Sequence, residues 1–192
     1  MFIVAIGGSP NQKSRSSELL NYSIDYLEHH GIESYTVTAH DFVAEDLLYA
    51  NFNSPSIKLL NEKIAKADGI IIATPIYKAA YSGVLKTILD LIAERGLLNK
   101  IILPIATAGT HNHFLALDYA LRPIITALKA KEILHGIFAT DNQIQYATST
   151  QPLLFDPSLK ARLIESLNEF IATLHHQKTN TLAIHPLLAE AI

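Results

Sequence analysis

The sequence predicts an α/β fold in which a five-stranded parallel sheet of order 2-1-3-4-5 lies between two layers of helices. Short apolar segments with the composition of strands alternate with amphipathic helical segments along the chain, and this alternation is typical of a parallel sheet covered on both faces. Right-handed crossovers leave few topologies for such a chain, and five strands favour the order 2-1-3-4-5.

Five segments have the composition of β-strands. The segment that begins at Gly69 is wholly apolar up to Thr74 and is followed at once by Pro75, which indicates a buried strand with a sharp end. The first, third and fourth segments are the most apolar of the five, as central strands should be. The predicted strands are Phe2–Ile6, Ser34–Thr38, Gly69–Thr74, Ile101–Thr107 and Ile133–Ala139.

Helical periodicity fills the gaps between these strands. After Gly83, for example, apolar residues recur at Leu85, Ile88, Leu89 and Ile92, which places them on one face of a helix. Two stretches without clear periodicity are predicted to be irregular, 41–55 and 177–192. The predicted helices are Ser16–His30, Ser56–Lys66, Ser82–Glu94, Phe114–Lys129 and Pro157–His176.

The chain is predicted to form one domain over residues 1–176, followed by a C-terminal tail at 177–192. A length of 192 residues is ordinary for a single domain with a proper core. The tail has more apolar residues than a solvated end needs, so we expect it to pack either on a neighbouring subunit or on its own domain. These apolar residues are Leu182, Ile184, Leu187 and Leu188.

Composition and charge exclude several classes of protein. Hydrophobic residues make up 49% and charged residues 17%, which is typical of a folded globular chain. A net charge of -3 without a Lys/Arg cluster argues against nucleic-acid binding. No apolar run approaches the roughly 18–20 residues that span a membrane, and no basic segment precedes the first strand as in a signal peptide. Cysteine is absent, so disulfides, thiolate metal sites and cysteine nucleophiles are excluded. We expect a soluble, cytoplasmic protein.

The loop after the first strand, Gly7 to Ser17, reads G-G-S-P-N-Q-K-S-R-S-S. Its serine hydroxyls, its two cations and the amides of the following helix suit a phosphate group. The alternative is a solvated loop in which Ser16 or Ser17 only caps the helix. The loop contains neither G-K-[ST] nor G-x-G-x-x-G, so an ATPase or a Rossmann dehydrogenase is disfavoured.

The loop after the third strand, Pro75 to Ser82, carries Tyr77, Lys78 and Tyr81 where small polar residues are usual. Two tyrosines at the carboxyl edge of a sheet suggest a flat aromatic ligand. The alternative is that both tyrosines pack with their hydroxyls at the surface and that Lys78 is a solvated charge.

The loop after the fourth strand, Ala106 to His113, reads A-T-A-G-T-H-N-H. Gly109 allows a tight turn, and the threonines offer hydroxyls. His111 and His113 could hold a metal in principle, but no third ligand at a suitable spacing is evident, so no metal site is predicted.

These three loops belong to strands that lie side by side in the order 2-1-3-4-5, so they should meet at its switch point. Together they predict a planar ligand that carries a phosphate, and flavin mononucleotide (FMN) fits this description better than a nucleoside triphosphate.

The sequence resembles the NAD(P)H-dependent FMN reductases of the flavodoxin-like superfamily, most of all the reductase component of the bacterial two-component alkanesulfonate monooxygenase systems. The likeness extends from residue 1 to about residue 176. Its most specific part is P-x-Y-K-x-x-Y-S-G-x-L-K, which begins at Pro75. One departure is Asn11, where many relatives have an arginine. The matching segments are Gly8–Pro10 with Ser14–Ser17, Glu45–Ala50, Ala67–Asp90, Leu103–Thr110, Leu117–Pro123 and Glu132–Ala139.

This resemblance implies a flavodoxin-like three-layer sandwich, binding of FMN and NAD(P)H, and a homo-oligomer, either a dimer or a tetramer. It also implies release of reduced FMN to an FMN-dependent monooxygenase of the alkanesulfonate type. Tyr119 would lie at a subunit interface in a local helix bulge, although an ordinary amphipathic helix is the alternative. The FMN-binding residues implied by the resemblance are Ser9, Ser14, Arg15, Ser16, Ser17, Pro75, Ile76, Tyr77, Lys78, Thr107, Gly109, Thr110 and His113.

The reaction so implied is hydride transfer from the nicotinamide C4 to the flavin N5, which needs alignment and no side-chain acid or base. No catalytic residue is therefore predicted. The alternatives are a reductase of quinones, azo compounds or metal ions that keeps its FMN bound, a flavodoxin-type electron carrier, and a scaffold without a nucleotide. The modest net charge argues against the carrier. The choice between NADPH and NADH stays open, with Arg15 and Lys78 as candidates for the 2′-phosphate.

Overall fold

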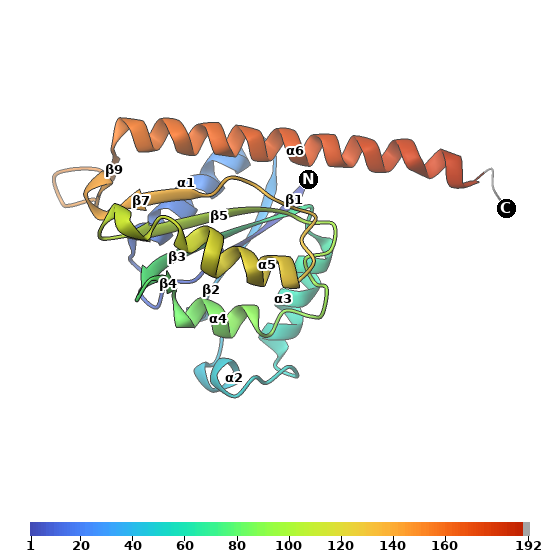
Figure 1. Cartoon of the computed structure of the whole chain (residues 1–192), viewed down its shortest axis with the longest axis horizontal. Coiled ribbons are helices and arrows are strands. Elements are labelled where there is room, and N and C mark those ends of the chain that lie inside the picture. Colours follow the sequence, from blue (N-terminus) through green and yellow to red (C-terminus); the bar gives the residue numbers. More distant parts are fainter. Residues whose placement is uncertain (190–192) are drawn as a thin grey trace.

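The computed structural model describes residues 1–189, and the side chains of residues 1–179. It has three layers, with a central sheet covered by helices on both faces, as in the flavodoxin-like fold (Figure 1). One face is covered by α1 (Arg15–His29) and α6 (Pro157–Ala189), and the other by α3 (Pro55–Lys66), α4 (Gly83–Leu89) and α5 (Arg122–Ala127).

The predicted strand order is confirmed. The main strands pair in parallel in the order β2-β1-β3-β5, and the last position is filled by β6 and β7, which both pair with β5. The strands are β1 (Phe2–Gly7), β2 (Glu33–Thr38), β3 (Gly69–Tyr77), β5 (Ile101–Ala108), β6 (Glu132–Ile133) and β7 (Ile137–Thr140).

The number of strands in this sheet is seven, whereas five were predicted. The predicted fifth strand is split, because β6 pairs with β5 up to Ile102 and β7 pairs with it only from Ile105 onward. Pro104 lies in the gap and has no N–H to donate to a neighbouring strand. The seventh strand is β4 (Ala80–Tyr81), a short antiparallel partner of β3. A separate two-stranded sheet is formed by β8 (Ile144–Gln145) and β9 (Leu154–Phe155).

Two hydrophobic cores form on the two faces of the sheet. In β1, Val4 and Ile6 pack toward α3 and α4, while Ile3 and Ala5 pack toward α1 and α6. All four side chains are fully buried. Complete burial of an isoleucine or leucine side chain contributes about 1.5–3 kcal/mol, so this central strand fixes the frame on which the loops at its carboxyl end are held.

The predicted helix Ser82–Glu94 is too long, since α4 ends at Leu89. Asn61 of α3 explains the early end. Its side-chain nitrogen donates to the carbonyl oxygen of Leu91 at 2.9 Å, and its oxygen accepts from the amide of Ala93 at 2.7 Å. These bonds satisfy backbone groups of a tighter, non-helical turn.

The predicted helix Phe114–Lys129 is not one regular α-helix. It contains a π-helix at Leu117–Leu121, followed by α5. The amide of Arg122 donates to the carbonyl oxygen of Leu117, five residues back, and Pro123 has no N–H with which to continue an α-helical ladder. Tyr119 lies in this π-helix, and 79% of it is exposed.

Both stretches predicted to be irregular contain helices. Residues 41–55 include α2 (Ala44–Leu48), preceded by a 3₁₀ turn at Ala39–Asp41 whose end is capped by Thr38 and Asp41. α6 does not stop at 176 but continues to Ala189, and it extends past the edge of the sheet (Figure 1). The apolar residues predicted to pack from the tail lie outside the described side chains: Leu182, Ile184, Leu187 and Leu188.

One face of α6 is buried at helical spacing against the sheet and α1. The buried residues are Leu159, Leu163, Leu167, Phe170 and Leu174. Despite its length, this helix is not apolar enough to cross a bilayer, and neither is any other helix among residues 1–189.

Candidate functional site

The three loops singled out in the sequence border one cleft of about 200 Å³ at the carboxyl edge of the sheet. They follow β1, β3 and β5, which are neighbours in the sheet, so the strand order brings them together. The lining residues are Asn11, Lys13, Ser14 and Arg15 from the first loop, Pro75, Ile76 and Tyr77 from the second, Thr107, Ala108 and Gly109 from the third, and also Asp141 and Tyr146.

Ser14 begins α1 at the phosphate-compatible end of this cleft. Its Oγ accepts from the amide of Ser17 at 3.1 Å and lies 2.8 Å from the Ser17 hydroxyl and 3.1 Å from the Ser16 hydroxyl. The helix cap is therefore Ser14, and not Ser16 or Ser17 as the alternative interpretation had it. Three hydroxyls thus gather at the positive end of a 15-residue helix, which is an arrangement that suits an anion.

The first and second loops are locked together behind the cleft. The hydroxyl of Ser82 donates to the carbonyl oxygen of Gly8, and the amide of Ser82 donates to Thr74 Oγ1 at 3.1 Å. The same Ser82 oxygen caps α4 by accepting from the amide of Leu85 at 3.0 Å. A Cβ on Gly8 would lie only 2.6 Å from the Leu85 Cβ, so glycine is required there for close approach.

The second loop is a β-hairpin and not an irregular loop. β3 runs on to Tyr77, and Lys78 and Ala79 form a two-residue turn with φ of 51° and 66° before β4. Positive φ at both turn positions is the geometry that matches the twist of a hairpin, here adopted without glycine. Tyr77 is 47% exposed beside the cleft. Tyr81 is half-buried, and burial raises the pKa of its hydroxyl.

The predicted binding residues are divided between the cleft, two neighbouring hollows, and positions that line none of the three. The cleft brings together Ser14, Arg15, Pro75, Ile76, Tyr77, Thr107 and Gly109. Ser9 and Ser17 border a separate hollow of about 210 Å³ between the first loop and the end of β2, and Thr110 borders a larger cleft on the other side of Gly109. Ser16, Lys78 and His113 line none of these three; Ser16 is buried beneath the Ser14 cap, while Lys78 and His113 are exposed.

A fourth segment, after β7, also borders the cleft, and sequence reasoning missed it. The Arg15 guanidinium makes an ion pair with Asp141, with 3.2 Å between Nη1 and Oδ2. Its Nε donates to the carbonyl oxygen of Ile144 at 3.4 Å, and its Cζ lies 5.0 Å from the centre of the Tyr146 ring. The sequence D-N-Q-I-Q-Y reads as an ordinary polar loop. The signal that could have found this segment is its position in the fold. It follows the predicted fifth strand, which neighbours the fourth, so the loops after both strands lie at the same edge of the sheet.

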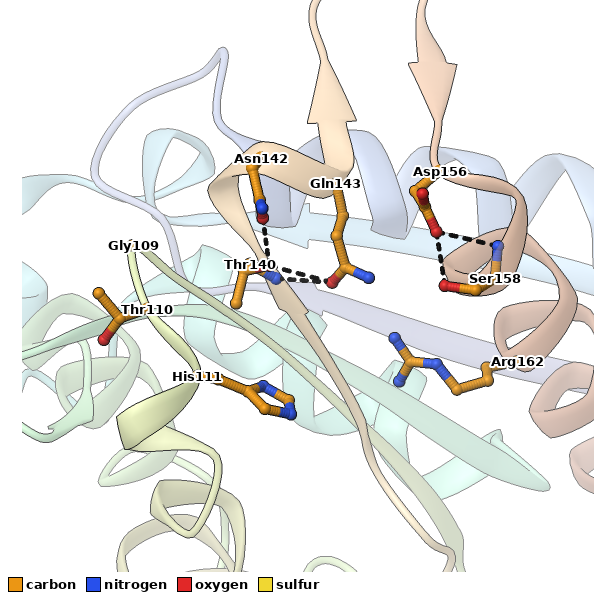
Figure 2. Close-up of a pocket in the computed structure, with 9 residues that line it drawn as sticks. All are labelled: Gly109, Thr110, His111, Thr140, Asn142, Gln143, Asp156, Ser158 and Arg162. Atoms are coloured by element: carbon orange, nitrogen blue, oxygen red, sulfur yellow. Dashed lines mark hydrogen bonds between the residues drawn. The ribbon is translucent and has the colours of Figure 1, made fainter.

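The larger cleft has a volume of about 840 Å³ and shares Gly109 with the first (Figure 2). Arg162 points into it from α6, and its Nη1 donates to the carbonyl oxygen of Phe138 at 3.3 Å. Asp156 caps α6, and the hydrogen bond from the Ser158 side chain, followed by that from the Leu159 amide, lowers the pKa of Asp156. The other lining residues are Thr110, His111, Thr140, Asn142 and Gln143.

His111 and His113 lie in a 3₁₀ turn at His111–His113. The His111 ring packs near Phe114 and Phe138, with centroids 5.8 and 5.6 Å apart. Among the side chains of residues 1–179, no group of three or more histidine, aspartate or glutamate residues is arranged to hold a metal ion.

Comparison with known proteins shows the family to which the chain belongs. The sequence profile of the family described as NADPH-dependent FMN reductase matches residues 1–145. The chain is 51% identical to "FMN reductase (NADPH)" of Pseudomonas putida over 174 residues, which cover 91% of this chain and 88% of the relative. It is 50% identical to "FMN reductase (NADPH)" of Escherichia coli over 178 residues, which cover 92% of each.

A solved structure is similar as well. The apo form of NADH:FMN oxidoreductase (EMOB) superposes with a TM-score of 0.80 at 30% identity, over 90% of this chain and 89% of that one. The family match covers well over half of the sequence, and the two relatives above align over nearly their whole length. The chain therefore belongs to the NADPH-dependent FMN reductase family and is an oxidoreductase that uses FMN and NAD(P)H.

Proposed function

We propose that this protein reduces FMN as a diffusing substrate and releases reduced FMN to a partner, an FMN-dependent monooxygenase of the alkanesulfonate type. The observation that carries the proposal is the single cleft in which a helix amino end with serine hydroxyls faces a hairpin that carries Tyr77. Such a cleft offers one end for a phosphate and one wall for a planar ring.

In this proposal the FMN phosphate binds at the amino end of α1, where Ser14 and Arg15 line the cleft and supply hydroxyl and cationic donors. Ser17 borders the neighbouring hollow, and its hydroxyl, 2.8 Å from that of Ser14, would add a third donor at this helix end. Ser9 and Ser16 are buried and shape the loop behind these donors. The isoalloxazine ring lies between the segment Pro75–Tyr77 and the segment Thr107–Gly109. Lys78, Thr110 and His113 are exposed at the outer margin, where they would contact the ring edge or the second substrate.

The chemistry supplied by bound FMN is acceptance of a hydride at N5. The protein aligns the two ring systems, and no side-chain acid or base is required. Backbone amides from Thr107 to Thr110 would stabilise the negative charge that develops on the ring, because hydrogen-bond donors fixed in place stabilise such charge. The hairpin tip at Lys78 and Ala79 is exposed, so the outer side of the ring would be accessible to nicotinamide.

We further propose that the larger cleft binds the adenylate half of NAD(P)H, with Arg162 facing a 2′-phosphate. Three features support this: the cleft adjoins the first at Gly109, it is roomy, and Arg162 donates one bond to the protein while its other donors remain directed into the cleft (Figure 2). Arg162→Gln should raise the KM for NADPH about 10-fold and leave the KM for NADH nearly unchanged, because only NADPH carries the extra phosphate. Equal changes for both coenzymes would contradict this assignment.

The proposed homo-oligomer, a dimer or a tetramer, has a candidate interface around the π-helix. Tyr119 there is 79% exposed, and the nearby Phe114 and Leu115 are 49% and 45% exposed. These side chains lie close together in the sequence, and large contiguous exposed apolar patches mark interaction sites. Tyr119→Ala should shift the sedimentation coefficient of the full chain toward the smaller species. An unchanged distribution would remove Tyr119 from the interface.

A cytoplasmic location and packing of 177–192 on a neighbouring subunit also remain proposals.

The decisive experiment compares steady-state NAD(P)H oxidation with FMN, FAD and riboflavin. We expect rapid turnover with added free FMN, and loss of yellow colour from the purified protein on dialysis. Protein that keeps its flavin through dialysis and oxidises NAD(P)H only when a quinone or an azo compound is added would instead be a reductase with bound FMN. Slow NAD(P)H oxidation with every free flavin would leave the electron-carrier alternative standing.

A further inference from the structure

We propose that Asp141 holds the affinity for FMN low, so that the flavin exchanges as a substrate. The aspartate does this by occupying Arg15 and by placing a negative charge beside the phosphate end of the cleft. This inference rests on the proposed function, since it concerns the same cleft, and it assigns a role to a segment that none of the three predicted loops contains.

The contacts of Arg15 give the first step. Its guanidinium is engaged from three directions by one segment: by the Asp141 carboxylate at 3.2 Å, by the Ile144 carbonyl oxygen at 3.4 Å and by the Tyr146 ring at 5.0 Å. Asp141, Tyr146 and Arg15 all line the same cleft of about 200 Å³. A phosphate that approaches Ser14 must therefore compete with Asp141 for the nearest arginine.

The charges lining the cleft give the second step. Among the described residues that line it, Lys13 and Arg15 are cationic and Asp141 is anionic, so Asp141 cancels about half of the attraction for an anion. A phosphate monoester carries nearly two negative charges at neutral pH. For a separation on the order of 7 Å at physiological salt, and an effective dielectric constant of roughly 30–60 at the boundary between protein and water, repulsion by one carboxylate corresponds to about a 3–10-fold loss of affinity.

Exposure argues against a purely structural role for this ion pair. The side chains of Arg15 and Asp141 are 31% and 44% exposed. Ion pairs this accessible contribute little to folding stability, because solvent screens them and ordering two side chains costs entropy. The pair is well placed to influence a charged ligand that enters the cleft.

The test measures binding of oxidised FMN and of riboflavin by fluorescence titration without NAD(P)H. Asp141→Asn keeps the shape and the acceptor oxygen but removes the charge. We expect its Kd for FMN to fall about 3–10-fold and its Kd for riboflavin, which lacks the phosphate, to stay constant. Asp141→Glu keeps the charge and should retain the wild-type ratio of the two Kd values. FMN binding by Asp141→Asn should also weaken more steeply with added salt, because its net attraction is larger.

Asp90→Asn is the matched control. It removes one negative charge from another exposed ion pair, with Lys86 on α4, and Asp90 does not line the cleft. We expect both Kd values to match wild type. Thermal unfolding of each variant, which should stay within about 2 °C of wild type, verifies that the fold is intact.

Three results would overturn the proposal: an unchanged Kd for FMN in Asp141→Asn, a weaker one, or an equal change for FMN and riboflavin. A weaker Kd for FMN would mean that Asp141 orients Arg15 for phosphate binding. Because the titration involves no turnover, its outcome is independent of whether the protein delivers reduced FMN to a partner. A failed NAD(P)H oxidation assay would contradict the proposed function and leave the binding result interpretable.

Discussion

Gly8→Ala should destabilise the protein and weaken FMN binding together, because Gly8 is the point where the first loop touches α4. An ideal Cβ at Gly8 lies 2.6 Å from the Cβ of Leu85 and 3.1 Å from its Cγ. Leu85 is fully buried and cannot move aside easily. The added methyl group must therefore push the loop away from the amino end of α4 and disturb the bond from Ser82 to the Gly8 carbonyl oxygen.

The expected magnitude combines two opposite effects. Overpacking a close contact costs about 1–3 kcal/mol. Replacing glycine by alanine reduces the entropy of the unfolded chain and so raises the free energy of unfolding by about 0.4–1 kcal/mol. The net loss is then between about 0 and 2.6 kcal/mol, or up to roughly 10 °C in Tm for a chain of this size. Since the loop carries Ser14 and Arg15, the KM for FMN should rise at least about 10-fold.

Gly83→Ala is the matched control for this substitution. Gly83 begins α4 close to the same contact, but a Cβ there would have no atom within 4 Å. Alanine should raise stability by about 0.4–1 kcal/mol. Urea unfolding and FMN titration of both variants test the reasoning. A Gly8→Ala protein with the stability and KM of wild type would refute the idea that close packing of Gly8 positions the first loop.

Two further changes have defined outcomes. Ser14→Ala removes the α1 cap and should cost about 1 kcal/mol in urea unfolding, while it raises the Kd for FMN more than that for riboflavin; equal effects on both flavins would separate Ser14 from the phosphate. Lys100 donates to the carbonyl oxygens of Ala65 and Ala67 at the end of α3, at 2.9 and 2.5 Å, so Lys100→Met should cost about 1 kcal/mol at pH 7. Burial lowers the pKa of Lys100, with Asp68 opposing. At pH values between the pKa of Lys100 in the folded protein and about 10.4, its pKa in the unfolded chain, the folded wild type binds fewer protons than the unfolded chain. The free energy of unfolding should therefore rise with pH over this interval. Lys100→Met should lose that rise, and an identical pH slope in both proteins would contradict it.

Much of the fold could be predicted from the sequence because the strong signals are local. The apolar run after Gly69 predicts a strand that is buried on both faces, and these residues are buried in the structure. The alternation of strands with helices then limits the possible topologies. The errors arose where a single side chain acts across the structure. Asn61 lies in α3, yet its hydrogen bonds end α4. Pro104 lies in β5, yet it lies opposite the break that divides the predicted last strand into β6 and β7.

The convergence of three loops followed from the strand order, whereas the arrangement within the cleft did not. The second loop was predicted only as a loop, whereas Lys78 and Ala79 adopt positive φ in a tight hairpin without the glycine that is usual in such a turn. The contribution of Asp141 and Tyr146 depends on where Arg15 points. A side-chain direction of this kind has no periodicity that a sequence could reveal.

A crystal structure of the protein with FMN would test the central claim most directly. The phosphate should lie at the amino end of α1 within hydrogen-bond distance of Ser14 and Ser17, and the ring should contact Ile76 and Tyr77 on one side and Thr107 on the other. Electron density that places the flavin in the larger cleft beside Arg162, or its phosphate away from α1, would contradict the account.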